Sequence, residues 1–362
     1  MKRILLPLAC LLFSVGVTAQ EVILAEEQTP SLEFILEIAL PITVEHDVRN
    51  VKITYTTVDP FGQPDTATGL VSLPMQDELV LPLALYNHGT VGARDEVPSV
   101  EGVLERLILG GLAGNNFIVL APDYLGLGDS DGIHPYLHAD TEASAGRDMI
   151  IAVRKWLAEE GISENGQLFL TGYSQGGHAS MALHRELEGT PDGELSVTAA
   201  AHLSGGYDLS APSPILLGLS DVPPTALSFF MNTLISYDYV YSLYGGIDSF
   251  MVEPYLTEAR RFLDEEIDLY EMGENLVALL DTNNTIVGAM FTQEFGFDVL
   301  DADSALVAAY EDNDVYDWAP TAPTLLYYCN ADETVNPSNT LLVDSVFRMN
   351  MADSVLLEDG GA

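Results

Sequence analysis

The chain alternates short apolar runs with stretches of helical periodicity. Residues 51–58 are β-branched and alternate in polarity, which predicts a strand, and residues 67–73 return after a turn at residues 59–62. Further apolar runs predict strands at residues 81–86, 117–121, 167–171, 197–203, 323–328 and 354–357. Apolar positions three and four apart predict helices at residues 142–160, 177–188 and 337–350. This alternation predicts the α/β class, with a mostly parallel sheet covered by helices on both faces.

The alternation of strand and helix patterns stops between residues 205 and 318, where amphipathic and aromatic-rich segments appear. Residues 227–235 and a helical stretch at residues 254–272 are examples, and no strong strand pattern interrupts them. We interpret this segment as a helical cap inserted between two strands, whose apolar side chains serve either packing or a substrate wall. The predicted division is therefore a signal peptide at residues 1–19, an α/β core at residues 20–204 and 319–362, and a cap at residues 205–318.

The N-terminus has the three parts of a secretory signal peptide. Met1-Lys2-Arg3 is basic, residues 4–17 are mostly apolar, and Ala19 ends a small-residue cleavage site. A membrane anchor is the competing interpretation, but the apolar run is shorter than the ~20 residues of a spanning helix. We therefore expect a secreted or periplasmic protein without stable membrane insertion. Cleavage would leave Cys329 as the one remaining cysteine, so no intramolecular disulfide is expected.

The chain is strongly acidic, with 13 lysines and arginines against 55 aspartates and glutamates and a formal net charge of −42. Such a charge disfavours nucleic acid and anionic membrane surfaces as partners. A hydrophobic content of 48% indicates a folded protein rather than an acidic disordered chain. No spacing resembles a calcium loop or a zinc site, so we expect no metal and no cofactor.

The most informative motif is Gly172-Tyr173-Ser174-Gln175-Gly176, which has the pattern G-x-S-x-G. It lies between a predicted strand and a predicted helix, the context of a nucleophile elbow. In that turn the central serine has a strained backbone, and a Cβ on either flanking glycine would collide with neighbouring backbone. The alternative is an ordinary glycine-rich turn with a surface serine. The flanking elements favour Ser174 as a catalytic nucleophile.

Several motifs together resemble the α/β-hydrolase superfamily, and more narrowly its secretory lipase and lipase-A-like branch of esterases. The resemblance extends from about residue 81 to the C-terminus and does not include the divergent cap. Its carriers are residues 86–90 (YNHGT), 121–124 (APDY), 134–136 (HPY) and 172–178 (GYSQGGH). The resemblance implies an α/β-hydrolase fold and activity on small-molecule or lipid esters.

The same resemblance implies roles for individual residues. Ser174 would attack the ester carbonyl, and the oxyanion would be held by the backbone N–H of Gln175 and of the loop with Gly89 and Thr90, with Thr90 favoured. Asp332 would be the triad acid, because it follows the strand predicted at residues 323–328. The alternatives are that Asp332 only stabilises a turn, or that the acid is one of two aspartates of the predicted cap, Asp298 and Asp301.

A catalytic histidine is expected after the last strand, but all seven histidines precede Asp332. The simplest account is that the sequence is a truncated fragment and that the base lies beyond Ala362. The histidines of the chain have other roles in this interpretation: His88 and His134 order loops, His178 packs beneath the nucleophile, and His202 lies on a buried strand. We expect none of them to bridge Ser174 and Asp332.

Three functions remain open. The first is a secreted serine carboxylester hydrolase, an esterase or lipase working through an acyl-enzyme. The second is a serine peptidase of the same fold, since one triad hydrolyses both esters and amides. The third is a non-catalytic binding protein that kept the fold and lost the base. Acyl-chain length and oligomeric state stay open.

Overall fold

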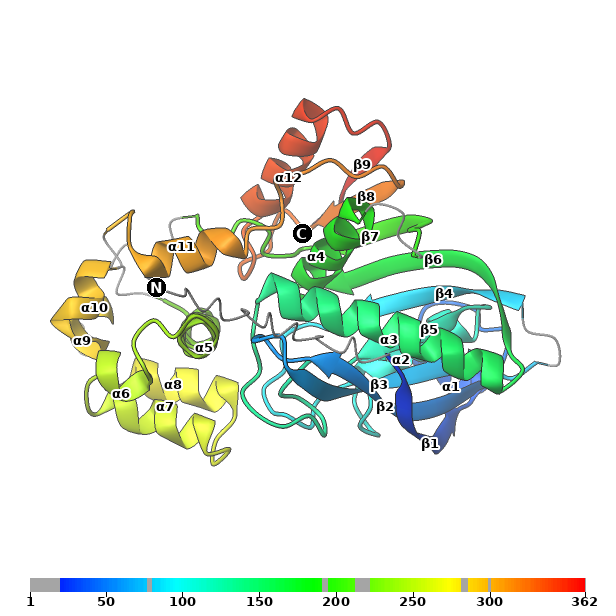
Figure 1. Ribbon diagram of the computed structural model, residues 1–362, viewed down its shortest axis with the longest axis horizontal. Coiled ribbons are helices and arrows are strands. Elements are labelled where there is room, and N and C mark those ends of the chain that lie inside the picture. Colours follow the sequence, from blue (N-terminus) through cyan, green and yellow to red (C-terminus); the bar gives the residue numbers. More distant parts are fainter. Residues whose placement is uncertain are drawn as a thin grey trace, which may run out of the picture.

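The strands form one sheet, which occupies the right-hand part of the molecule in Figure 1. The computed structural model describes residues 20–76, 80–190, 195–211, 222–280, 286–298 and 301–361, so the predicted signal peptide lies outside the described residues. Among these residues, nine strands pair in the order β1-β2-β3-β5-β4-β6-β7-β8-β9. Their bounds are β1 Val22–Ser31, β2 Val48–Val58, β3 Pro64–Pro74, β4 Val80–Asn87, β5 Ile118–Pro122, β6 Ser163–Tyr173, β7 Ala199–Leu203, β8 Thr324–Tyr328 and β9 Val355–Asp359.

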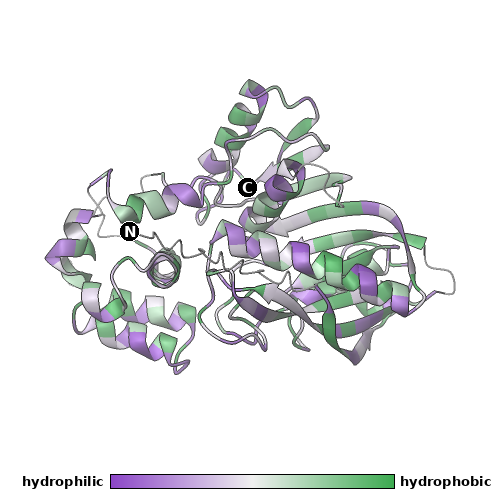
Figure 2. Cartoon of the chain, viewed as in Figure 1, coloured by the Kyte–Doolittle hydropathy of each residue, from purple (hydrophilic) through white to green (hydrophobic). Residues whose placement is uncertain are grey.

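The sheet is antiparallel at its N-terminal side and parallel elsewhere. The pairs β1–β2, β2–β3 and β3–β5 are antiparallel, whereas β5, β4, β6, β7, β8 and β9 pair in parallel. Strand β5 is buried along its whole length, as expected for a strand covered on both faces, whereas the edge strand β9 has no buried residue. Figure 2 shows stretches of hydrophobic residues in the strands and on the helices alike.

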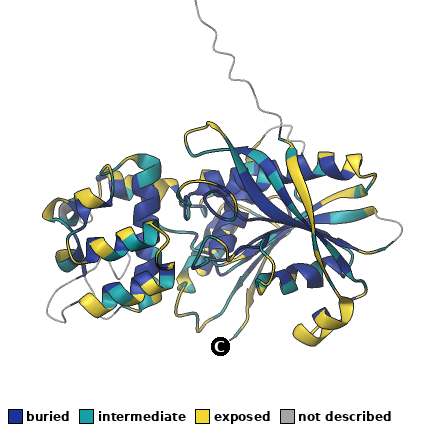
Figure 3. Cartoon of the chain, turned by 90° about the horizontal axis from the view of Figure 1, so that it is seen from below, coloured by how far each residue is buried: buried dark blue, intermediate teal, exposed yellow. Residues whose placement is uncertain are grey.

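Helices cover both faces of this sheet (Figures 1 and 3). On one face, α3 (Ala139–Glu159), α4 (Gln175–Gly189) and α12 (Ser338–Met349) share a hydrophobic cluster with the strands. On the other face, α1 (Glu33–Ala39) and α2 (Glu105–Ala113) pack with residues such as Val119 and Ala121 in a separate cluster. The predicted α/β class and its helix-covered, mostly parallel sheet are confirmed.

The chain between β7 and β8 forms a helical lobe, which we define as helices α5 to α11 (Figure 1, left). The lobe has its own hydrophobic cluster, in which Phe250, Phe291 and Phe295 stack with centroids 4.3 to 6.2 Å apart. The helices are α5 Pro224–Tyr241, α6 Ile247–Phe250, α7 Tyr255–Leu263, α8 Leu269–Leu279, α9 Ile286–Met290, α10 Gln293–Asp298 and α11 Ala305–Asp312. None of the described helices, in the lobe or elsewhere, has the length and hydrophobicity needed to span a bilayer.

The helical stretch predicted at residues 254–272 is wrong as a single element, because the structure divides it into α7 and α8. Glu265 has a positive φ of 57°, which ends the first helix, and the Asp268 side chain accepts a hydrogen bond from Glu271 N–H and caps the second. Strand β1 and helices α1 and α2 were not anticipated. Helix α1 is short, with seven residues, too few for a clear helical period.

Candidate active site

Three loops that carry the predicted site residues leave the same edge of the sheet. Strands β4, β6 and β8 run parallel, so their carboxyl ends lie together. Gly89 and Thr90 follow β4, Ser174 follows β6, and Asp332 follows β8. In open α/β sheets this edge is where ligands bind.

Ser174 occupies a strained turn between β6 and α4. Its φ is 57° and its ψ is −120°, a conformation that side-chain-bearing residues rarely adopt. Its N–H donates to Leu203 O at 3.0 Å, and its carbonyl accepts from Gly177 N–H and His178 N–H at 2.9 and 3.2 Å. Backbone bonds to β7 and α4 therefore hold the strained residue in place, as the strand–turn–helix pattern predicts.

The glycines on either side of Ser174 are required by close backbone contacts. A Cβ on Gly176 would overlap the carbonyl of Asn87 and lie 2.7 Å from His88 O. A Cβ on Gly172 would overlap the carbonyl of Gly176 and lie 2.8 Å from Asn87 O. The predicted collision at both positions is confirmed.

The loop after β4 lies directly against this turn. A Cβ on Gly89 would be 3.8 Å from Ser174 Cβ. Gly89 N–H donates to Glu105 Oε1 at 3.3 Å, so it is already engaged, whereas Thr90 N–H has no hydrogen-bond partner among the described residues. Gln175 is the first residue of α4, where N–H groups have no partner within the helix. Thr90 and Gln175 are thus the two predicted donors that remain available.

Asp332 is a half-buried residue in the loop after β8. Its Oδ1 accepts hydrogen bonds from Thr334 N–H and Val335 N–H, both at 2.9 Å. Burial and the negative charge of Asp332 raise the pKa of the Tyr173 hydroxyl, which brings the carboxylate into the electrostatic surroundings of the residue before Ser174. The cap aspartates Asp298 and Asp301 lie in and after helix α10 of the lobe.

No described histidine side chain forms a hydrogen bond with Ser174 or Asp332. His88, His134, His178 and His202 are each occupied through both ring nitrogens, which matches the structural roles predicted for them. Their partners are Gly89 O and Asp123 O for His88, Leu125 O and Gln175 Nε2 for His134, Glu142 Oε2 and Asn313 O for His178, and Ser180 Oγ and His184 Nδ1 for His202. Burial also lowers the pKa of His134 to about 4 and that of His202 well below its usual value, so neither ring is a ready proton acceptor near neutral pH.

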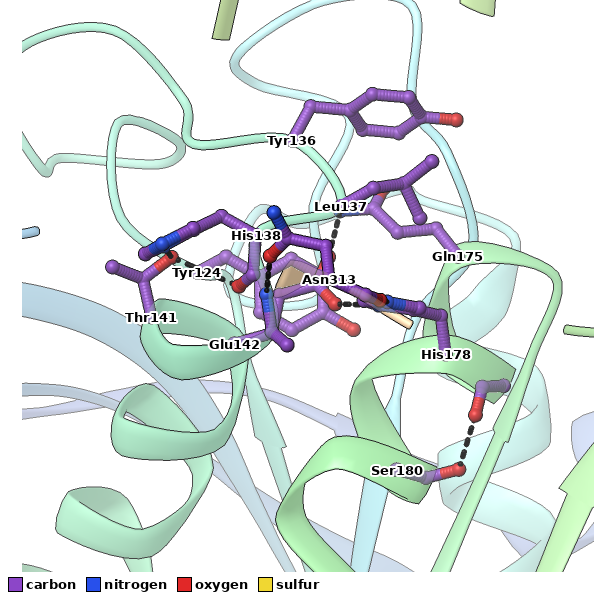
Figure 4. A network of polar contacts seen from close by, with 12 residues as sticks. Tyr124, Tyr136, Leu137, His138, Thr141, Glu142, Gln175, His178, Ser180 and Asn313 are labelled. Carbon is purple, nitrogen blue, oxygen red and sulfur yellow. Dashed lines mark hydrogen bonds and ion pairs between the residues drawn. The ribbon is translucent and has the colours of Figure 1, made fainter. Parts of the chain in front are cut away.

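Two carboxylates that the sequence did not point to support the site, the half-buried Glu105 and the buried Glu142. Glu105 accepts from Gly89 N–H and from the Tyr86 hydroxyl, the latter at 3.1 Å. Glu142 lies between α3 and α4 and bonds to Gln175 and His178 (Figure 4). The available signal was an acid on the buried face of a predicted helix, since Glu142 precedes Ala145 and Met149 by three and seven positions.

A cavity of about 540 Å³ lies between the loops at the sheet edge and the helical lobe. Thr90 and Gln175 line it, whereas Ser174 is not among its lining residues. Its apolar wall comes from the loops and from the lobe, with Leu127, Ile133, Tyr136, Ile235, Phe262 and Ile267 among the lining residues. In the part of the chain that the structure describes, no group of three or more histidine, cysteine, aspartate or glutamate side chains is arranged to hold a metal ion.

Solved structures resemble this chain over almost its whole length. A ligand-bound form of the rice cell wall degrading esterase LipA from Xanthomonas oryzae has 26% sequence identity and a TM-score of 0.82, with 94% of this chain and 91% of that chain covered. A Legionella pneumophila protein has 25% identity and a TM-score of 0.83, with 94% and 92% covered. Candida antarctica lipase A in its closed state, at 14% identity, a TM-score of 0.67 and coverage of 94% and 76%, supports the fold alone.

No protein-family model and no curated protein sequence matches the chain. The structural matches identify the fold as an α/β-hydrolase fold related to those of LipA and lipase A. The structural kinship to the esterase LipA suggests a carboxylester hydrolase.

Proposed function

We propose that this protein is a secreted serine hydrolase of carboxylic esters, with Ser174 as nucleophile and Asp332 as the acid of its triad. The observation that carries the proposal is the strained conformation of Ser174 at the junction of β6 and α4, beside the Thr90 loop. A positive φ at a serine costs free energy, on the order of 1–3 kcal/mol, and such strain collects at functional sites. The similarity to LipA favours esters over amides.

In the proposed reaction, Ser174 Oγ attacks the ester carbonyl carbon. The carbonyl oxygen becomes an oxyanion, which accepts hydrogen bonds from the N–H groups of Gln175 and Thr90. The positive end of the α4 dipole adds to this stabilisation. Collapse of the tetrahedral intermediate expels the alcohol and leaves an acyl-enzyme, which water then hydrolyses. In this scheme Gly89 lets the loop backbone lie close to Ser174 but donates no hydrogen bond to the oxyanion, because its N–H is bonded to Glu105.

The base in this proposal is a histidine outside the seven of this sequence, carried by chain that follows β9. Support comes from the register of the sheet: Asp359, the last residue of β9, pairs with Tyr328, the last residue of β8. Chain leaving β9 therefore emerges beside the loop of Asp332. Every buried histidine of the present chain is bonded elsewhere, so none competes for this role.

The proposed substrate is a small-molecule or lipid ester that enters the cavity under the helical lobe, which then acts as a cap over residues 205–318. A volume of about 540 Å³ suits a ligand of drug-like size. Exchange of Phe262 or Ile235 for smaller residues would then change the preferred acyl-chain length. A secreted or periplasmic location belongs to the same proposal, and N-terminal sequencing of the exported protein would test cleavage after Ala19.

The second candidate is a non-catalytic ester-binding protein. It is favoured by one observation, the lack of a hydrogen bond between any described histidine side chain and the Ser174 hydroxyl. Under this candidate Ser174 binds a ligand carbonyl without forming an acyl-enzyme. The two candidates differ in covalent chemistry, so an acyl adduct distinguishes them.

The test uses free imidazole as a substitute base, because it can accept the Ser174 proton in the absence of a triad histidine. We expect the parent chain to hydrolyse 4-nitrophenyl butyrate faster as imidazole is added, beyond the background rate of imidazole in solution. Ser174→Ala should show the background rate alone, and mass spectrometry should find a butyryl adduct on Ser174 in the parent. A 4-nitrophenyl palmitate series alongside defines the chain-length preference. Equal rates for parent and Ser174→Ala, with no adduct, would refute the proposal.

A further inference from the structure

Glu142 sits at the junction of the two helices that flank the nucleophile turn. Its side chain is buried, at 1% exposure, on the first turn of α3. One oxygen, Oε1, accepts from Gln175 Nε2 at 2.9 Å, and the other, Oε2, accepts from His178 Nδ1 at 2.7 Å. Both partners belong to α4, whose first residue is Gln175 (Figure 4). The carboxylate thus ties the N-terminus of α4 to α3.

The Gln175 side chain is fixed by a second contact. Its other amide N–H donates to His134 Nε2 at 2.9 Å, and His134 Nδ1–H donates to Leu125 O at 2.8 Å. Burial lowers the pKa of His134 to about 4, so the ring is neutral and one nitrogen can accept. Because both amide hydrogens are occupied, the orientation of the Gln175 side chain is determined by Glu142 and His134.

His178 faces hydrogen-bond acceptors on both sides. Its Nδ1 contacts Glu142, and its Nε2 lies 2.9 Å from Asn313 O. With Glu142 as a carboxylate, both ring nitrogens of His178 donate, Nδ1 to Glu142 and Nε2 to Asn313 O. Asn313 follows helix α11 of the lobe, and its Oδ1 accepts from Ala139 N–H at 2.8 Å. The network therefore reaches from the lobe to the residue beside Ser174.

We propose that Glu142 is a positioning residue of the hydrolase, which holds Gln175 so that its backbone N–H faces the oxyanion. This inference rests on the proposed function, because it assigns Glu142 to the geometry of the same site. Gln175 directly follows the strained Ser174, and its side chain is the contact through which α3 holds that position. Displacing an oxyanion donor lowers turnover, while substrate binding changes little.

Glu142→Gln is a conservative variant, because the network can lose one proton and keep its hydrogen bonds. In Glu142→Gln, the new carbonyl accepts from Gln175, and the new amide donates to His178 Nδ1 if His178 has lost one proton. That neutral arrangement satisfies every group at unchanged geometry. Glu142→Asp keeps the charge but withdraws the carboxylate by one methylene, and Glu142→Ala removes both acceptors.

We expect imidazole-assisted turnover of 4-nitrophenyl butyrate to fall about tenfold in Glu142→Asp and about a hundredfold in Glu142→Ala, with KM unchanged, and to stay within about threefold in Glu142→Gln. Asp148 provides the matched control. It lies on the same helix, is fully buried, and bonds to Thr57 Oγ1 at 2.8 Å and to Arg147 Nε at 3.0 Å, away from the site. Asp148→Ala should lower Tm comparably to Glu142→Ala without changing turnover per folded molecule.

A second measurement does not depend on activity. With 15N-labelled histidine and glutamine, NMR should show two protonated ring nitrogens on His178 in the parent, one in Glu142→Gln, and a displaced Gln175 backbone amide resonance in Glu142→Asp. If Ser174→Ala hydrolyses the ester as fast as the parent, the proposed function fails. The spectra still show whether Glu142 holds Gln175 and His178 in place. An unchanged Gln175 amide and unchanged turnover in Glu142→Asp, or equal turnover losses in Glu142→Asp and Asp148→Ala, would overturn the positioning role.

Discussion

The Ser174 side of the site and the Asp332 side are held by different means. Around Ser174 the backbone is packed against other backbone, so that Gly172 and Gly176 have no room for a methyl group. Around Asp332 the loop is partly exposed, and the aspartate accepts from two N–H groups two and three residues ahead. The first side tolerates almost no change of sequence, and the second tolerates change at a small cost in stability. The following variants measure that contrast as the free energy of unfolding.

Gly176→Ala should have the largest effect. The new methyl group would collide with the carbonyls of Asn87 and His88, which belong to the adjacent strand end and cannot move independently. We expect a loss of about 3 kcal/mol or more, measured by urea unfolding of the purified protein. Gly62 is the control, because it has open space around its Cβ position, although its positive φ still costs about 1 kcal/mol in Gly62→Ala. A Gly176→Ala protein as stable as Gly62→Ala would contradict the comparison.

Ser174→Gly should act in the opposite direction. Glycine adopts a φ of 57° without steric cost, so the strain of the serine backbone is relieved. We expect stabilisation of about 1 kcal/mol with complete loss of imidazole-assisted hydrolysis. Ser174→Ala separates the two contributions, since alanine removes the hydroxyl and keeps the strain. If Ser174→Gly and Ser174→Ala have the same stability, the turn is not strained in solution.

Glu188 joins the two sides, because it lies in the last turn of α4 and accepts from Thr321 N–H and Ala322 N–H shortly before β8. Burial opposes its ionisation, but the His184 side chain and these N–H groups outweigh burial and lower its pKa to about 2. The ionised form is therefore favoured in the folded protein, and this contribution is present above the unfolded pKa of about 4.3 and is lost as the pH falls toward 2. With solvent screening, Glu188→Gln should cost about 1 kcal/mol at pH 6. The difference from the parent should vanish near pH 2, and a pH-independent difference would contradict the linkage.

Asp332→Ala should have the smallest effect on stability. Two hydrogen bonds at a partly exposed loop are replaced by water, so we expect a loss of about 0.5 kcal/mol. If extension of the chain by a histidine after β9 restores hydrolysis without imidazole, Asp332→Ala in that extended protein should abolish the restored activity. A loss as large as that of Gly176→Ala would show that the two sides are not held differently.

The sequence predicted the parts of the fold that depend on local pattern. The strands from β2 onward were predictable from β-branched and apolar runs. The turn at Ser174 was predictable because it requires glycine at two nearby positions, where a Cβ would collide with backbone. Strand β1 and helix α1 escaped because their residues are largely exposed, so no buried face marks their period. The break between α7 and α8 depends on Glu265, whose left-handed conformation has no sequence marker comparable to glycine.

Only those site residues that lie in or next to a sequence motif were predictable. Ser174, Gln175 and Thr90 lie in or beside recognisable motifs, whereas Glu105 and Glu142 act through contacts with residues 16 and 33 positions away. A carboxylate on the buried face of a helix signals that a partner exists, but the partner is determined by tertiary packing. The engagement of Gly89 N–H by Glu105 could not be inferred from the loop sequence for the same reason.

Asn313 has a consequence for the order in which the protein matures. Its bonds to His178 and Ala139 close loops of 135 and 174 residues, and contacts of such separation form late in folding because loop closure is entropically costly. During translation, α3 and α4 are synthesised long before Asn313. We expect nascent chains that end before residue 313 to leave Ser174 unreactive toward ester-like probes, even though the whole nucleophile turn has been synthesised. Completion of the helical lobe would then determine when the proposed activity appears during synthesis.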